Sequence, residues 1–374
     1  MVPEDCQALQ NVDIPLEVRW RMLAPFWPLT RTTGYGRCIL IAARDLFGVE
    51  DINATTVQSL SAKITNANQP GWYSQVLKQK SKIDLSILDD LTTSRGQPLH
   101  QDSRFFRIVT RFDYIVTVQS REDLAYVESV TGVGVHSLKD LTRALEKAFD
   151  KAVSQGLAGV KSGLAYSRQL KYQSVSEAEA SRAFEQIFQS GSRASIPSEN
   201  TNRLQDYLMH QVVRQAAERR LPVQIHTGFQ AGNRNTIMNS NPAYLNNLIM
   251  EYPQAKFDLF HGGYPYCSEL ATLAKNLPNV YADLCWLHII SPAVTRRVLH
   301  EWIETIPAHK ILGFGGDFFH VEGTYGHAQL ARAITADVLA DKVEEGYLKE
   351  DEAIGLMKRI LYSNGKELFA ERTV

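Results

Sequence analysis

The chain has 374 residues, of which 44% are hydrophobic, and its formal net charge at neutral pH is −1. This length and composition suffice for one large barrel or two ordinary domains. The charged residues form no basic stripe with interleaved aromatic residues, so a nucleic-acid-binding role is not expected. No apolar run approaches the roughly 20 residues of a membrane span. Residues 1–6 have neither the basic nor the apolar region of a signal peptide.

The cysteines are scattered along the chain and form no CxxC motif (Cys6, Cys38, Cys267, Cys285). This spacing argues against a disulfide scaffold and against a structural zinc knuckle, and it fits a reducing compartment. The sequence therefore predicts a cytoplasmic protein that does not associate with a membrane.

The N-terminal part is predicted to be helical. Apolar residues recur at helical spacing in Pro15–Phe26, Gly34–Phe47 and Thr55–Ala67. No strand-like apolar segment precedes these helices, so residues 1–80 are expected to form a mostly helical N-terminal region.

From about residue 80 the chain alternates strand-like and helix-like segments, which is typical of βα units around a parallel sheet. The expected strands are Lys82–Leu88, Phe105–Val116, Leu157–Ser162, Val223–His226, Phe257–His261, Val280–Leu284 and Ile311–Phe314. The expected helices are Leu138–Ser154, Leu204–Glu218, Ala243–Glu251, Cys267–Asn276, Ser291–Thr305, Thr324–Glu344 and Lys349–Arg372. We expect one α/β domain over residues 1–374, a TIM-barrel-like (β/α)₈ fold whose first strand is absent.

One polar, Ser-rich segment, Tyr172–Glu199, interrupts the alternation. It is predicted to be a βα insertion with a helix around Glu177–Gln189. Because βα loops emerge at the catalytic face of a barrel, we expect this insertion to lie over the mouth.

Three strand-like segments each end in a potential metal ligand, namely His226, His261 and Asp317. In a barrel the C-terminal ends of the strands meet at one face, so these residues are predicted to converge there. Imidazole and carboxylate groups bind zinc and similar divalent ions, and a position left open for water gives a catalytic site.

Other residues near the same strand ends are candidates for substrate binding. Lys161 could bind an anionic substrate directly or, after carbamylation, bridge two metal ions. Tyr166 and Arg168 follow in the same loop and could bind a carboxylate. Tyr264 and Trp286 would place aromatic rings at the mouth. Arg111 and Asp113 alternate along a predicted strand and are expected to form a structural ion pair.

These segments resemble the amidohydrolase superfamily, and specifically its amidohydrolase-related branch, which includes the amidohydrolase-like domain of nodulin/glutamine synthetase fusions. The resemblance runs from about Gly34 to the C-terminus and is densest over residues 221–320. It is carried by Ile225-His226-Thr227-Gly228, His261-Gly262-Gly263-Tyr264-Pro265, Asn279–Asp283 and Gly315-Gly316-Asp317.

The resemblance implies a distorted (β/α)₈ barrel that binds one or two divalent metals, with zinc expected and manganese or iron as alternatives. It implies that His226 and Asp317 are metal ligands of the fifth and eighth strands. His261 would be a ligand or a catalytic residue, and Asp317 would also accept a proton.

The chain departs from this family in one respect: it contains no His-x-His pair, which the family carries after its first strand. The missing motif coincides with the missing strand. The expected explanation is that the chain begins downstream of strand one, and the alternative is a relative that lacks these ligands.

The sequence thus predicts a metal-dependent hydrolase that acts on a small, polar, carboxylated substrate through metal-activated water. Asp317 and His261 would be its catalytic residues, and a homo-oligomer is one possible assembly. The alternatives are a decarboxylase, a uronate-isomerase-like enzyme, or a barrel without catalytic function.

Overall fold

The computed structural model describes residues 3–89, 102–190 and 198–369. The chain divides into two compact units. The helical unit comprises residues 1–84, 284–300 and 313–357, and the sheet unit comprises residues 85–283, 301–312 and 358–374. The expectation that both form one barrel domain stays a prediction. No helix among the described residues is long and apolar enough to span a bilayer.

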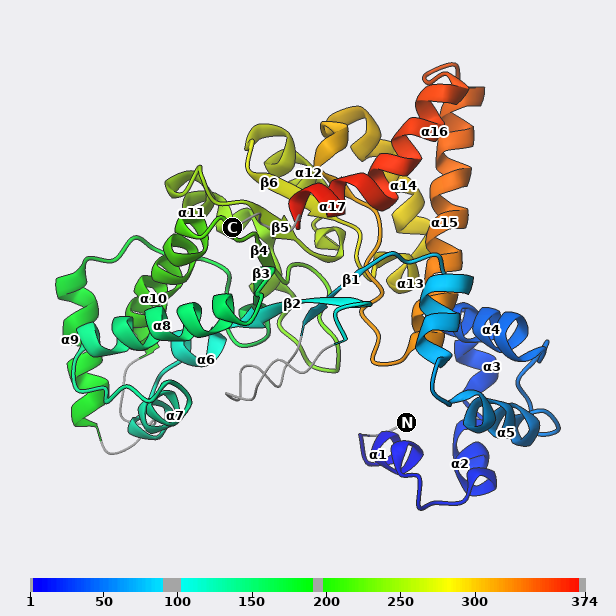
Figure 1. Ribbon diagram of the computed structural model, residues 1–374, viewed down its shortest axis with the longest axis horizontal. Helices are drawn as coiled ribbons and strands as arrows, with labels where there is room; N and C mark the ends of the chain where they lie inside the picture. The colour runs from blue at the N-terminus through cyan, green and yellow to red at the C-terminus, as the bar shows by residue number, and fades with distance from the viewer. Residues whose placement is uncertain (1–2, 90–101, 191–197, 370–374) are drawn as a thin grey trace. The chain divides into compact units, whose positions relative to one another are not determined.

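The sheet unit contains all seven predicted strands, and every pair of neighbours is parallel. The strands are β1 (Ser86–Asp89), β2 (Phe106–Arg111), β3 (Gly159–Ser162), β4 (Val223–Ile225), β5 (Phe257–Leu259), β6 (Val280–Asp283) and β7 (Ile311–Leu312). Their order in the sheet is their order in the chain (Figure 1). Within the described residues β7 does not pair with β1, so the sheet is a partial barrel without a first strand, as predicted.

Two kinds of side chain alternate along these strands. Val223, Ile225, Phe257 and Leu259 are fully buried and face the helical layer. The residues between them point to the inner face, where Gln224 of β4 lies in register with Asp258 of β5. The inner face of this sheet therefore carries polar groups in place of the usual apolar filling of a barrel.

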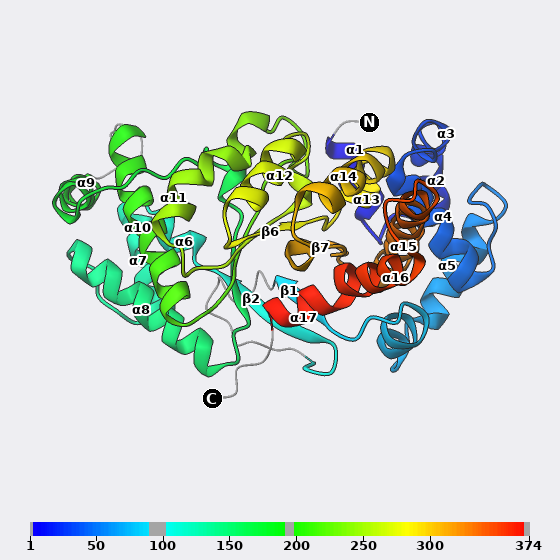
Figure 2. The ribbon, with the colours of Figure 1, turned by 90° about the horizontal axis from the view of Figure 1, so that it is seen from above.

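The helices of the sheet unit form a layer on the outer side of the sheet, in which α9 packs on α10 (Figures 1 and 2). They are α6 (Asp113–Val116), α7 (Arg121–Thr131), α8 (Leu138–Ser154), α9 (Glu177–Gln189), α10 (Ser198–Glu218), α11 (Asn246–Glu251), α12 (Cys267–Asn276) and α17 (Asn364–Leu368). Short 3₁₀ or π segments are η3 (Leu164–Tyr166), η5 (Ile237–Ser240), η6 (Pro242–Leu245), η7 (His261–Gly263), η8 (Ala308–Lys310) and η9 (Arg359–Ser363).

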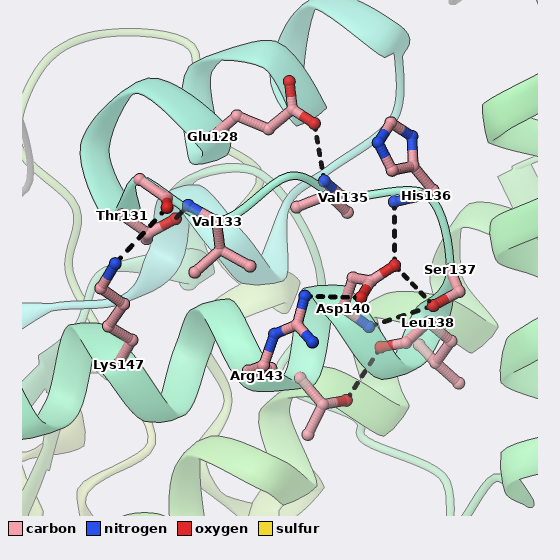
Figure 3. A network of polar contacts seen from close by, with 12 residues as sticks. Glu128, Thr131, Val133, Val135, His136, Ser137, Leu138, Asp140, Arg143 and Lys147 are labelled. Carbon is pink, nitrogen blue, oxygen red and sulfur yellow. Dashed lines mark hydrogen bonds and ion pairs between the residues drawn. The ribbon is translucent and has the colours of Figure 1, made fainter.

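The start of α8 shows how local side chains fix a helix boundary (Figure 3). Ser137 accepts a hydrogen bond from the backbone N–H of Asp140 at 3.2 Å, and Asp140 accepts from the backbone N–H of His136 at 3.2 Å. Glu128 of α7 accepts from the backbone N–H of Val135 at 2.6 Å. These contacts satisfy donors that a helix start leaves unpaired and hold the α7–α8 connection.

The helical unit is built around two long helices, α4 and α15. Gly326 of α15 lies against the backbone of Cys38 of α4, where an added Cβ would come within 2.2 Å of the carbonyl oxygen. The Cys38 thiol donates to the carbonyl of Gly323 at 3.3 Å. The elements of the helical unit are α1 (Pro3–Gln10), α2 (Leu16–Leu23), α3 (Trp27–Thr30), α4 (Gly34–Phe47), α5 (Val57–Ala67), η1 (Ser74–Lys80), α13 (Leu287–Ile290) and α15 (Val321–Glu344).

Several predicted elements were too long, and two of them are interrupted by another element. The predicted strand Phe105–Val116 ends at Arg111, because Asp113 begins the short helix α6. The predicted helix Lys349–Arg372 is divided into α16 (Glu350–Lys358), η9 and α17, and residues 370–372 lie outside the described part. The side-chain amide of Asn364, at the start of α17, donates to the carbonyls of Ala308 and Ile311 at 2.7 Å each, which fixes the chain at that point. Helices α14 (Pro292–Thr305) and α16 contribute residues to both units.

Candidate functional site

Two of the predicted site residues, His226 and His261, meet in the sheet unit. His226 directly follows β4, and His261 begins the turn after β5. The Nε2 atom of His261 lies 3.0 Å from Nδ1 of His226, and both rings are buried. The sequence prediction that these two strand-end histidines converge agrees with this geometry.

The hydrogen bonds of the pair assign its protons. Nε2 of His226 lies 2.9 Å from the carbonyl oxygen of Phe229, which can only accept, so this nitrogen carries the proton. Nδ1 of His226 then holds a lone pair and accepts the hydrogen bond from Nε2–H of His261. Burial, together with the charges of Lys161 and Arg111, lowers the pKa of His226 to about 3, although the hydrogen bond to Phe229 acts in the opposite direction. His226 is therefore neutral at physiological pH.

The turn after each strand is shaped by left-handed backbone. His261, Gly262 and Gly263 have φ values of 62°, 59° and 64°. Gly228 has φ 73°, and a Cβ there would come within 2.5 Å of the backbone of Gly263. Thr227 donates a side-chain hydrogen bond to the carbonyl of Phe260 at 2.7 Å. The two turns thus touch backbone to backbone, and this contact brings the imidazoles together.

Lys161 lies beside the pair on the inner face of the sheet. It is buried, and its ammonium lies over the ring of Phe260 at 3.2 Å from the centroid. Lys161 belongs to β3 and Phe260 follows β5, so the side chain crosses β4. This position explains why the lysine charge lowers the pKa of His226.

Tyr166 covers the other side of His226. Its ring centroid is 4.7 Å from that of His226, and its hydroxyl accepts a hydrogen bond from the backbone N–H of Ala231 at 2.9 Å. The ring is part-exposed. Tyr264, which follows His261, is half-buried, and its substrate-binding role stays a prediction.

Arg111 has a different ion-pair partner from the one predicted. Its guanidinium binds the carboxylate of Asp89 at 2.5–3.1 Å through two nitrogens. Asp113 instead accepts from the backbone N–H of Gly163 at 2.8 Å, and burial raises its pKa. The prediction was wrong because the strand ends before Asp113, so the two side chains do not alternate along one strand.

Arg168 is engaged within the fold. It binds Asp206 at 2.5 Å, Gln205 at 3.0 Å and the carbonyl of Lys171 at 3.0 Å. Arg168 and Asp206 are both largely buried and line a polar cavity of about 650 Å³ with residues of α9 and α10. The role of Arg168 in substrate binding stays a prediction, since its donors already have partners.

Residues 173–175 of the insertion line a cavity with Ser167 and Asn239, which follow β3 and β4, whereas its helix packs against other helices. Its helix α9 packs against α10 and α8 through a buried face that includes Phe184 and Ile187 (Figure 1). The helix therefore joins the helical layer, where this apolar face finds a partner, instead of lying over the strand ends. Residues 191–197 of the insertion lie outside the described part.

Asp317 and Trp286 belong to the helical unit, so the predicted convergence of Asp317 with the His pair and the substrate-binding role of Trp286 both stay predictions. Both have left-handed backbone, with φ 50° and 67°, which is uncommon for residues other than glycine. The N–H of Trp286 donates to the carbonyl of Gly315 at 3.0 Å, which joins the two loops that carry them.

A second buried histidine pair, which was not predicted from the sequence, lies in the helical unit. His288 and His327 lie 3.2 Å apart through Nδ1 and Nε2, and Nδ1 of His327 donates to the carbonyl of Gly316 at 3.0 Å. Burial lowers the pKa of His327 to about 4 and that of His288 well below its usual value. A pairing between residues 39 positions apart leaves no local signal in the sequence.

The donor set around His226 fits a metal ion only in part. Two imidazole nitrogens on one tetrahedral zinc lie about 3.3 Å apart, close to the observed separation. However, these two nitrogens share a proton here. The described residues also contain no group of three His, Cys, Asp or Glu side chains that could hold a metal ion. The pair by itself therefore does not form a metal site.

Comparison with known proteins gives a consistent family. A family model described as Amidohydrolase matches residues 144–364, more than half of the chain. Protein fluG of Emericella nidulans is 26% identical over 350 residues, which are 88% of this chain and 40% of that protein. A uronate isomerase of Rhizorhabdus wittichii is 33% identical over 97 residues, which are 26% of this chain and 21% of that protein. The matched segments cover less than half the length of either relative.

Solved structures share the fold at low identity. A uronate isomerase of Thermotoga maritima matches with a TM-score of 0.80 and 17% identity, over 98% of this chain and 87% of that one. A glucuronate isomerase of Caulobacter crescentus matches with a TM-score of 0.78 and 18% identity, over 96% of this chain and 79% of that one. A Lactobacillus casei protein whose name places it among the metal-dependent hydrolases has a TM-score of 0.69 and 17% identity, over 99% and 91%. These likenesses show that the fold is shared, and the family model, which matches more than half of the chain, shows that the chain belongs to the amidohydrolase family.

Proposed function

We propose that this chain is an enzyme that binds a small carboxylated substrate in the sheet unit and moves protons on it, as an isomerase of sugar acids does. The observation that carries the proposal is the neutral, directionally hydrogen-bonded pair of His226 and His261 beside the buried ammonium of Lys161. The names of the similar proteins from Thermotoga maritima, Caulobacter crescentus and Rhizorhabdus wittichii support this substrate class.

The proton arrangement gives the two histidines different roles. With Nε2 of His261 protonated, its Nδ1 carries the lone pair and can accept a proton from a substrate carbon or hydroxyl group. The imidazolium that forms is stabilised because Nδ1 of His226 accepts the hydrogen bond from its Nε2–H. His226 cannot become the charged partner itself, because its pKa is about 3. His226 thus orients His261, and Lys161 binds the substrate carboxylate.

The second candidate is hydrolysis, which the description of the matching family favours. Members of this family usually bind a divalent metal, and zinc, with manganese or iron as alternatives, is the ion proposed for this chain. His226, His261 and Asp317 are the proposed ligands. No reaction step is assigned to the ion here, because the donors that the described residues bring together do not complete its site.

The test compares reaction classes directly. The protein is incubated with D-glucuronate or D-galacturonate, and separately with N-acyl amino acids and lactones, with chelator or with added zinc or manganese. Isomerisation in D₂O introduces deuterium at the carbon next to the carbonyl, which NMR detects. Ketose formation supports the proposal, whereas hydrolysis without isomerisation favours the second candidate.

A matched pair of variants tests the site. We expect His226→Gln to lower turnover by about 100-fold or more, the usual range for loss of acid–base assistance. His210→Gln replaces another buried histidine of the same unit, which contacts Tyr252, and is expected to retain activity. Equal losses in both variants would argue against an acid–base role for the His pair.

A further inference from the structure

A row of polar residues crosses the inner face of the sheet below the His pair. Register pairs Arg111 with Lys161, Lys161 with Gln224, Gln224 with Asp258, and Asp258 with Tyr281. Parallel neighbours in register point to the same face, so these side chains form one layer across β2–β6.

Asp258 is the group in this row that lacks a full set of partners. It is fully buried, and its Oδ2 accepts a hydrogen bond from Gln224 at 3.0 Å. Its Oδ1 has no hydrogen-bond partner among the residues that the structure describes. A buried carboxylate with one unsatisfied oxygen costs more free energy than the neutral, protonated acid in the same place.

Lys161 supplies the nearest positive charge. Its side chain crosses β4, and its ammonium lies over Phe260, which follows β5 two residues after Asp258. Burial raises the pKa of Asp258 to about 7, while the hydrogen bond from Gln224 and the charge of Lys161 act in the opposite direction. The ionisation of Asp258 therefore depends on whether this ammonium has another counter-charge.

We propose that Asp258 is a positioning residue for Lys161, which balances its ammonium in the free protein and takes up one proton when a substrate carboxylate replaces it as counter-charge. This inference rests on the proposed function, because it uses Lys161 as the carboxylate-binding residue. The step is a protonation only: solvent supplies H⁺, the Asp258 carboxylate becomes a carboxylic acid, and no other bond changes. Carboxylate capture is thereby coupled to proton uptake.

The other groups that face Asp258 do not compete for this proton. His226, above the row, is neutral. Arg111 is already paired with Asp89. From β6, Tyr281 faces Asp258, and its pKa is raised by burial and by the charges of Glu367 and Asp258, so its hydroxyl stays protonated near neutrality. His261 already donates to His226 through Nε2–H.

The experiment measures binding instead of turnover. D-Glucuronate is titrated calorimetrically at pH 7 in two buffers of different ionisation enthalpy, which gives the number of protons taken up. We expect uptake of up to about half a proton at pH 7, because Asp258, with a pKa of about 7, is already half protonated in the free protein, and an affinity that weakens by roughly five- to tenfold between pH 6 and pH 8. Asp258→Asn should abolish both effects, and Tyr281→Phe should preserve them.

A second variant keeps the test decisive if Asp258→Asn does not fold. Gln224→Met removes the hydrogen bond that lowers the pKa of Asp258, so it should move the midpoint of the affinity profile to higher pH. An unchanged midpoint, or binding without proton uptake in the wild type, overturns the inference.

Failure of the proposed function gives a different result. Lys161→Met should abolish anion binding. If it does so and no proton is taken up, only the role of Asp258 is wrong. If D-glucuronate does not bind, the sugar-acid class is wrong, and acetate then tests the carboxylate site alone. Acetate binding that does not depend on Lys161, or no acetate binding, overturns this inference as well.

Discussion

At the scale of single residues, the chemistry of the site follows from which nitrogen carries each proton. His226 is held neutral by burial and by neighbouring positive charge, and its two ring nitrogens have opposite roles. A histidine in this state can orient a second imidazole without competing for its proton. His261 is therefore the member of the pair proposed as acid and base.

The neutral state of His226 predicts a pH-dependent stability. Its folded pKa of about 3 lies below the unfolded value near 6.5, so the unfolded chain binds the proton first as pH falls. The contribution of His226 to the free energy of unfolding is complete above pH 6.5 and is lost as the pH falls toward 3. At pH 5 the loss from His226 is on the order of 2 kcal/mol.

Urea unfolding of the wild type and of His226→Gln at pH 7 and pH 5 measures this contribution. The decrease from pH 7 to pH 5 should be smaller in the variant by about 2 kcal/mol. Comparing variants is necessary because Asp258, with its raised pKa, contributes with the opposite sign. His136→Gln, at an exposed position, is the control and should behave as the wild type. Parallel pH profiles for the wild type and His226→Gln would contradict a buried neutral imidazole.

At the scale of elements, two short turns determine the site. The turn after β4 and the turn after β5 touch at Gly228 and Gly263, and both glycines have positive φ. Only glycine permits both the backbone angle and the approach of the two main chains. The strands fix the direction of the histidines, and these turns fix their separation.

Gly228→Ala is expected to separate the turns. The new Cβ would lie 2.5 Å from backbone atoms that cannot move aside as a flexible side chain can. We expect a loss of about 3 kcal/mol in the free energy of unfolding, together with loss of the His261–His226 hydrogen bond in ¹⁵N NMR spectra.

Gly132→Ala is the matched control in the same unit. Gly132 also has positive φ, at 64°, but a Cβ there would meet only the end of the Lys147 side chain at 3.5 Å. This variant should lose about 1 kcal/mol and keep the imidazole hydrogen bond. If both variants lose the same stability, the close approach of the two turns has no energetic role.

At the scale of the whole molecule, the sheet has two edges. β1 pairs only with β2 among the described residues, and all four of its residues are half-exposed. β4 and β5 each have two neighbouring strands and are fully buried. The backbone amides of β1 are therefore less protected from solvent than those of β4 and β5.

Hydrogen exchange measured by mass spectrometry should report this order. Amides of β1 are expected to exchange at least about tenfold faster than those of β4 and β5, because an edge strand opens without breaking a second ladder. The two central strands serve as internal controls. Equal protection of β1 and β4 would mean that the outer edge of β1 is covered.

The sequence by itself determined the strands, most helices and the two strand-end histidines. These features are local: an apolar strand followed by His and Gly, or a Ser three residues before an Asp at a helix start, is written within a few positions. The bounds of α8 and α12 match their predictions for this reason. The family resemblance rests on the same short segments.

Only the tertiary structure decided which side chains pair with one another and which buried groups carry a charge. Arg111 pairs with Asp89, Arg168 with Asp206, and His288 with His327 across long stretches of chain. Asp258 has its unusual environment because neighbouring strands bring Gln224 and Lys161 to it. Desolvation and long-range pairing depend on what surrounds a group in space, and a linear sequence does not contain that information.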